Sequence, residues 1–92
     1  MSIQWLFDVI EDRKKNPNEK SYTSSLFADG LPRIAQKVGE EGTEVVVAAL
    51  AQDDERLIEE VADLTYHTLV LLSARGIDPA QISAELEKRH HK

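Results

Sequence analysis

Two long segments with helical periodicity, joined by a short polar link, constrain this chain more than any other feature. Apolar residues recur at intervals of three and four from Leu31-Pro32 to about Gln52, and again from Asp53 or Asp54 to about Arg75. The link at Gln52 to Asp54 is so short that the two predicted helices must be antiparallel neighbours. The sequence therefore predicts a helical hairpin at the centre of the fold.

Two shorter helices are predicted on either side of this hairpin. The first runs from about Ser2 to Lys14 and ends at Asn16-Pro17-Asn18. The last begins at Asp78-Pro79, with Asp as the N-cap and Pro at the first helical position. Glu19 to Gly30 has no clear periodicity, so we expect either an ordered functional loop or disorder there. No segment alternates with period two, which predicts an all-α bundle of about four helices.

The chain is small and acidic. Its 92 residues suffice for a single domain, residues 1–92, with a modest core, so we expect oligomerisation. The formal charge of −6 argues against a nucleic-acid polymer as partner. There is no cysteine, no apolar run long enough for a membrane, and no basic stretch before an apolar run at the start. We therefore expect a cytoplasmic protein without disulfides.

Acidic residues interrupt the apolar stripe of the first hairpin helix. On a helical wheel, Glu41 lies about 20° from Ile34, in the middle of the stripe. Glu44 and Lys37 lie together at one edge, and Glu40 lies nearer solvent. The stripe itself consists of Ile34, Val38, Val45, Ala48 and Ala49.

The second hairpin helix carries acids in the same way. Glu60 lies at the edge of its predicted stripe, and Asp63 and His67 continue on that side. Tyr66 and Val70 lie opposite, so this helix is apolar on two sides, which favours a second layer that could be another subunit. The predicted stripe consists of Leu57, Val61, Leu64, Thr68, Leu71 and Leu72.

The four acids should meet across the hairpin. Glu44 lies about nine residues before the turn and Glu60 about seven after it, so at 1.5 Å per residue their levels differ by about 3 Å. Two unit charges 4 Å apart repel by about 4 kcal/mol at an effective dielectric constant of 20. The cluster must therefore take up protons, stay hydrated or bind cations, and oxygen ligands alone suit Mg²⁺ or Mn²⁺ better than Zn²⁺.

Two neighbours of the acids have more than one interpretation. A packed or hydrogen-bonded role fits His67 better than a role as metal ligand. Lys37 either balances the negative charge or holds a phosphate group. An ordinary solvated acidic face remains the alternative to a metal site.

The arrangement of the acids resembles a known signature. Glu41-x-x-Glu44, fifteen further residues and Glu60-x-x-Asp63 is similar to the signature of the all-α nucleoside-triphosphate pyrophosphohydrolases, which include MazG and the dimeric dUTPases. RIAQKVGEEGTEVVVAAL followed by EEVADLTYHTLVLL resembles the phosphoribosyl-ATP pyrophosphohydrolase family, as do SYTSSLFADG and the ending LEKRH. The resemblance covers nearly the whole chain.

The resemblance implies an activity and an assembly. The family hydrolyses the α–β phosphoanhydride of phosphoribosyl-ATP to phosphoribosyl-AMP and pyrophosphate, the second step of histidine biosynthesis. It depends on Mg²⁺, for which Mn²⁺ is a possible substitute. It also implies an obligate dimer of helical protomers with sites near the subunit interface.

By position, the resemblance also assigns roles to residues. Four acids would be metal ligands, with Glu40 or Glu44 orienting or deprotonating the attacking water. Lys37 and Arg33 would face the substrate phosphates, and Ser21-Tyr22-Thr23 would close on the substrate. Gly42 departs from the pattern, where Ala is common. The four predicted metal ligands are Glu41, Glu44, Glu60 and Asp63.

Two other functions remain open. A house-cleaning (d)NTP pyrophosphatase of the MazG type would use the same chemistry on another substrate. A non-catalytic helical dimerisation module would carry the acids as a solvated face. A substrate panel separates the first from the predicted enzyme, and the response of the melting temperature to Mg²⁺ separates the second.

Overall fold

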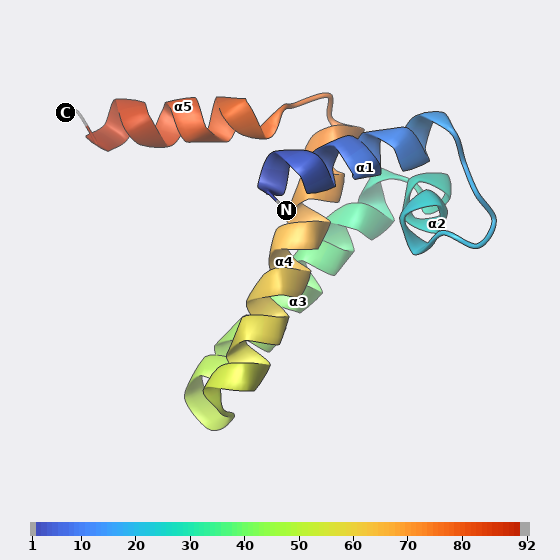
Figure 1. Ribbon diagram of the computed structural model, residues 1–92. Helices are drawn as coiled ribbons and strands as arrows, with labels where there is room; N and C mark the ends of the chain where they lie inside the picture. Colours follow the sequence, from blue (N-terminus) through green and yellow to red (C-terminus); the bar gives the residue numbers. More distant parts are fainter. Residues whose placement is uncertain (1, 91–92) are drawn as a thin grey trace.

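The computed structural model describes residues 2–90, which form five α-helices and no strand (Figure 1). The predicted all-α class is confirmed, but the described residues hold five helices rather than about four. None of these helices is both long enough and apolar enough to cross a membrane. The helices are α1 (Ile3–Lys15), α2 (Tyr22–Asp29), α3 (Leu31–Ala51), α4 (Asp54–Ala74) and α5 (Pro79–His90).

Side-chain caps explain where the predicted helices begin. Ser2 and Asp53 each accept a hydrogen bond from the main-chain N–H three residues on, at 3.1 Å and 2.9 Å. Asp78 accepts from the N–H two residues on at 2.8 Å, and Pro79 opens α5. Gly76, just beyond α4, takes the left-handed conformation with φ 70°. These starts and stops agree with the sequence prediction; His91 and Lys92 lie outside the described residues.

Helix α2 was missed by the sequence analysis, which expected a loop or disorder from Glu19 to Gly30. Ser21 caps this helix by accepting from the N–H of Ser24 at 3.1 Å, and Gly30 ends it with φ 93°. Two turns are too few to show a 3.6-residue period, and so short a helix depends on packing rather than propensity. Leu26 supplies that packing, since only 2% of it is exposed.

Helices α3 and α4 form the predicted antiparallel hairpin, and α1 and α2 pack against one end of it (Figure 1). We call this the closed end, where α3 begins and α4 ends. Helix α5 runs away from the hairpin in Figure 1, and none of its residues is buried. The core at the closed end consists of Phe7, Ile10, Leu26, Ile34, Leu69 and Val70.

The buried face of α4 differs from the predicted stripe. No residue of that stripe is fully buried, and Val61 is 43% exposed. The side that turns inward carries Glu60, His67 and Val70. Because α4 is apolar on two sides, periodicity alone does not tell which side meets the core of the protomer. On α3 the prediction is better, since Ile34 is buried and Glu41 is partly buried within the same stripe.

Large apolar side chains remain exposed at the other end of the hairpin. We call them the turn-end surface: Val46, Val47, Leu50, Ile58 and Val61, which are between 43% and 84% exposed. A second apolar region lies between α4 and α5, where a hollow of about 400 Å³ is lined by Leu64, Leu72, Ile82 and Leu86 among others. Val61 in the first region and Leu64 and Leu72 in the second belong to the predicted α4 stripe.

Candidate active site

Three carboxylates from the two hairpin helices converge on one point. Glu41 on α3 and Glu60 and Asp63 on α4 each place an oxygen atom within 4.8 Å of the other two. Glu60 is buried, Glu41 is partly buried and Asp63 is exposed. The cluster is thus buried at Glu60 and open to solvent at Asp63, so a soluble substrate can reach it.

Glu44 lies outside this group of three, although the sequence prediction placed it with them. It is exposed, about one helical turn nearer the hairpin turn than Glu41. Its charge still acts nearby, because it helps to raise the pKa of Arg56. Three of the four predicted acids therefore meet, and the role of Glu44 as a ligand stays a prediction.

Two cations of the chain partly neutralise the cluster. Lys37 Nζ lies 3.3 Å from an oxygen of Glu41, and Arg56 Nη2 donates to Glu60 at 2.9 Å. A hydrogen bond to Glu59 and the charge of Glu60 raise the pKa of Arg56 further above its usual value. The sequence analysis did not single out Arg56, although its position four residues before Glu60 is the spacing of a helical ion pair.

The predicted phosphate-binding residues lie on α3 beside the cluster. Arg33 Nη1 and Lys37 Nζ lie 3.7 Å and 4.0 Å from the same oxygen of Glu40. Glu40 and Arg33 are exposed and Lys37 is partly buried, so all three side chains are accessible. Lys37 contacts the cluster at Glu41, and Arg33 contacts the neighbouring Glu40, so each presents a positive charge that can pair with phosphate oxygens.

The segment Ser21-Tyr22-Thr23 opens α2 and contacts α4, instead of forming the predicted loop. The Tyr22 hydroxyl lies 3.1 Å from His67 Nε2, and Thr23 is hydrogen-bonded to the Tyr66 hydroxyl. Burial raises the pKa of Tyr66, and the bond to Thr23 partly offsets this. His67 is the hydrogen-bonded histidine that the sequence analysis favoured, and Ser21 serves as the cap of α2.

The three converging acids fit a hard divalent cation. They offer only carboxylate oxygens, which Mg²⁺ prefers, and Mg–O distances of 2.0–2.1 Å put two ligands of one ion at most about 4.2 Å apart. The oxygens lie within 4.8 Å of one another, so side-chain adjustments of about half an ångström would suffice. Glu41, Glu60 and Asp63 are thus the residues that could hold the metal.

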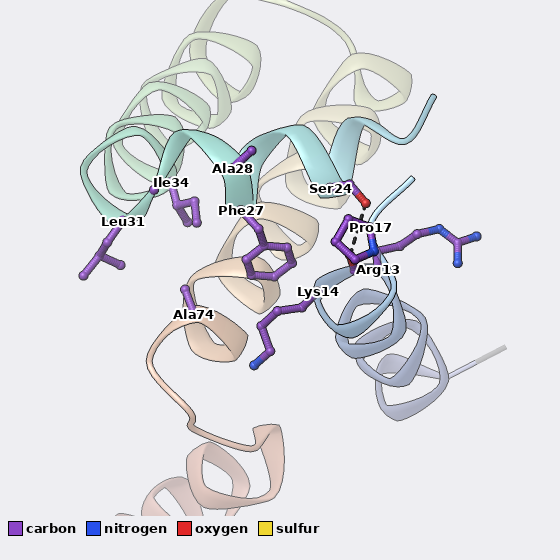
Figure 2. A pocket seen from close by; sticks show the side chains of 10 residues that line it. Arg13, Lys14, Pro17, Ser24, Phe27, Ala28, Leu31, Ile34 and Ala74 are labelled. Atoms are coloured by element: carbon purple, nitrogen blue, oxygen red, sulfur yellow. Dashed lines mark hydrogen bonds between the residues drawn. The ribbon is translucent and has the colours of Figure 1, made fainter. Parts of the chain in front are cut away.

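A separate pocket lies at the closed end and is distinct from the acids (Figure 2). Its volume is about 490 Å³, and Phe27, Ile34 and Lys14 are among its lining residues. In Figure 2 a dashed line marks the hydrogen bond from the Ser24 hydroxyl to the main-chain oxygen of Arg13, which closes one side. Its lining, among the described residues, includes no acid, so this pocket offers no carboxylate to a metal ion.

Comparison with known proteins shows which family the chain belongs to. The model of a family described as phosphoribosyl-ATP pyrophosphohydrolase matches residues 4–90, nearly the whole chain. The chain belongs to this family. The match includes both hairpin helices and the start of α2, which are the parts that form the candidate site.

Relatives in the phosphoribosyl-ATP pyrophosphohydrolase family are similar along almost all of this chain. A phosphoribosyl-ATP pyrophosphatase of Clostridium botulinum (strain Kyoto / Type A2) is 52% identical over 90 residues, covering 98% of this chain and 82% of that protein. The phosphoribosyl-ATP pyrophosphatase of Lacticaseibacillus casei is 55% identical over 91 residues, covering 99% and 83%. A histidine biosynthesis bifunctional protein, HisIE, of Staphylococcus aureus (strain Mu50) is 45% identical over 91 residues, which are 99% of this chain and 43% of that protein.

Proposed function

We propose that this protein hydrolyses the α–β phosphoanhydride of phosphoribosyl-ATP, releasing phosphoribosyl-AMP and pyrophosphate, as the second step of histidine biosynthesis. The observation that carries the proposal is the convergence of Glu41, Glu60 and Asp63 within 4.8 Å, in a chain that belongs to the family with this activity. An acidic face in solvent would leave Glu60 exposed, whereas this carboxylate is buried, which is costly even with Arg56 as its partner.

Each of the site residues has a part in the proposed reaction. Glu41, Glu60 and Asp63 would hold Mg²⁺, with Glu44 as a further ligand, and Lys37 and Arg33 would bind the phosphate oxygens. A water oxygen forms a bond to phosphorus as the bridging P–O bond breaks, and pyrophosphate leaves. Glu40 or Glu44, whose carboxylates are exposed beside the cluster, accepts the proton of that water.

Bound Mg²⁺, or Mn²⁺ in its place, supplies neutralisation of the phosphate charge and a lowered pKa for a coordinated water. The chain supplies the positions: α3 and α4 hold the acids at one level of the hairpin, with Lys37 one turn away along α3. Such positioning is the main contribution that a protein can make to phosphoryl transfer.

Pyrophosphate release tests the proposal directly. Phosphoribosyl-ATP, ATP, dATP and dUTP are compared at equal concentration, with Mg²⁺ and with excess chelator. We expect Mg²⁺-dependent release that is fastest by at least a hundredfold with phosphoribosyl-ATP. Faster hydrolysis of a plain nucleoside triphosphate would show the MazG-type activity, and no release from any substrate would contradict an enzymatic role.

We also propose that the active form is a homodimer in which a second copy covers the turn-end surface. Five large apolar side chains are exposed there, and exposed apolar patches of this kind mark interaction sites. The family resemblance implies the same assembly. Light scattering with size-exclusion chromatography should give twice the chain mass, and a monomer at all concentrations would contradict the dimer.

The cytoplasmic location of the protein also remains a prediction.

A further inference from the structure

We propose that His67 is a positioning residue for substrate binding, which fixes Tyr22 as a side wall of the active site. The proposal rests on the proposed function and adds a residue that is neither a metal ligand nor a phosphate ligand. It depends on one non-local hydrogen bond, between Tyr22 Oη and His67 Nε2 at 3.1 Å, and on the place of that bond relative to the acids.

The second hydrogen bond of His67 shows which atom donates between Tyr22 Oη and His67 Nε2. Its Nδ1 lies 2.7 Å from the main-chain oxygen of Asp63, and a carbonyl oxygen can only accept, so Nδ1 carries the hydrogen. In the neutral ring Nε2 is then an acceptor, and the Tyr22 hydroxyl donates to it. Only 6% of His67 is exposed, so its ring is held by the surrounding protein as well as by these two bonds.

The pair lies on the side of α4 that carries the acids. His67 is seven residues beyond Glu60 and four beyond Asp63, which places it about 20° and about 40° from them around the helix. Along the axis it is about 6 Å beyond Asp63, away from the hairpin turn. Counting equal distances from that turn, His67 is at about the level of Lys37 on α3.

A substrate that reaches from the acids toward Lys37 would therefore pass Tyr22. Half of Tyr22 is exposed, while its hydroxyl is fixed to a buried group. Its ring also contacts the rings of Tyr66 and His67, with centroids 6.3 Å and 5.8 Å away. An aromatic ring with one free face and a fixed orientation can pack against a ribose or a base of the substrate.

The contact acts on binding and not on the chemical step. Tyr22 belongs to α2 and touches α4 one turn beyond the acids, while none of the converging oxygens belongs to it. Losing the bond should let the start of α2 move away from the site without moving Glu41, Glu60 or Asp63. A hydrogen bond of this kind contributes a few-fold to about tenfold in an equilibrium constant.

The experiment compares Tyr22→Phe, His67→Asn and His67→Gln with the unaltered protein. Asn can keep the bond to the Asp63 carbonyl but is too short to reach Tyr22, whereas Gln extends an acceptor oxygen to about the place of Nε2. We expect Tyr22→Phe and His67→Asn each to raise KM for phosphoribosyl-ATP about three- to tenfold, with kcat within twofold. His67→Gln should restore KM to within about twofold.

Two further measurements separate positioning from stability and from the metal site. The double variant Tyr22→Phe with His67→Asn should have the KM of either single variant, because both remove the same bond. Mg²⁺ affinity, measured by calorimetry without substrate, should stay within twofold. Ser25→Ala removes a hydroxyl that donates to the main-chain oxygen of Tyr22 but leaves the Tyr22–His67 bond intact, so it is the matched control and should leave KM unchanged.

The outcomes distinguish this proposal from the proposed function. An unchanged KM in Tyr22→Phe, with only a lower melting temperature, would overturn the positioning role while Mg²⁺-dependent turnover remained. A loss of kcat or of Mg²⁺ affinity in His67→Asn that Gln did not restore would also overturn it. No turnover of phosphoribosyl-ATP by the unaltered protein would contradict the proposed function and remove the basis of this inference.

Discussion

The two ends of the α3–α4 hairpin differ in how much of their apolar surface the rest of the chain covers. At the closed end, α1 and α2 cover the hairpin, and Ile34 and Val70 are at most 1% exposed. At the turn end, Leu50 and Ile58 are 84% and 70% exposed, with no helix of the described chain over them. Within the described chain, the hairpin is thus covered at one end and bare at the other.

This difference explains why the acids occupy the middle of the hairpin. Glu41, Glu60 and Asp63 lie between a core that orients α3 and α4 and a surface that a second copy would cover. A rigid support on one side keeps the carboxylates close despite their mutual repulsion. Asp63 is exposed, so a substrate can reach the acids from solvent, and the boundary between the two ends is a suitable place for catalysis.

The largest effect should come from the acids at this boundary. Glu41→Gln combined with Asp63→Asn should lower Mg²⁺-dependent pyrophosphate release about a thousandfold or more, which corresponds to about 4 kcal/mol of transition-state stabilisation. The melting temperature without metal should change little, because the repulsion removed offsets the lost ion pair between Glu41 and Lys37. Glu85→Gln, on exposed α5, is the control for a lost carboxylate. Turnover that survived the double change would show that these acids are not the metal site.

The next prediction compares the two ends by replacing one leucine with alanine at each. Leu26→Ala at the closed end should destabilise the protein by about 2–5 kcal/mol at every protein concentration, since it leaves a cavity in the core. Leu50→Ala at the turn end should cost less than about 0.5 kcal/mol in the monomer. In the dimer it should weaken association, so that the melting temperature falls most at high concentration.

Thermal melts of the two variants, each at two protein concentrations that differ a hundredfold, measure these stability changes. Equal, concentration-independent losses in the two variants would mean that the turn end is already covered within the protomer. A loss for Leu50→Ala that grows with concentration would assign that surface to a second copy.

A smaller effect concerns the charge balance at the boundary. Arg56→Gln should raise Mg²⁺ affinity about three- to tenfold, because it removes a positive charge that donates to Glu60 at 2.9 Å. The solvent exposure of Arg56 limits the size of this effect. Titration calorimetry gives the affinity, and Arg89→Gln, which breaks a similar pair with Glu85, serves as control. A weaker affinity in Arg56→Gln would mean that Arg56 orients Glu60 for the metal.

The sequence also predicts the structure of some parts of the chain better than others. The hairpin, its caps and the meeting of Glu41, Glu60 and Asp63 follow from helical period and a short link. Helix α2 does not, because eight residues show no period and its order comes from contacts with distant residues. The Tyr22–His67 bond joins positions 45 residues apart, so no local pattern indicates it.

The inward face of α4 is the other part that the sequence does not predict. Both sides of this helix are apolar, and a wheel cannot distinguish a face that meets the protomer core from one left for a partner. Val61 and Val70 are equally apolar, yet one is 43% exposed and the other fully buried. The choice depends on where α1 and α2 pack, which is a property of the whole fold.

The smallest predicted effect lies at Gly42, between the acids of α3. Apart from its chain neighbours and the nearby backbone of its own helix, nothing lies within 4 Å of the place where a Cβ would stand. Gly42→Ala should therefore stabilise the monomer by about 0.5–1 kcal/mol, because Ala loses less backbone entropy in a helix.

The control is Gly30→Ala, which should destabilise because Gly30 has φ 93°. The melting temperature of Gly42→Ala at low and at high protein concentration tests whether a second copy reaches this part of α3. Stabilisation at both concentrations means that no second copy approaches Gly42. If Gly42→Ala raises the melting temperature at low concentration but lowers it at high concentration, a helix of a second copy packs against this part of α3. The active site would then lie within the subunit interface.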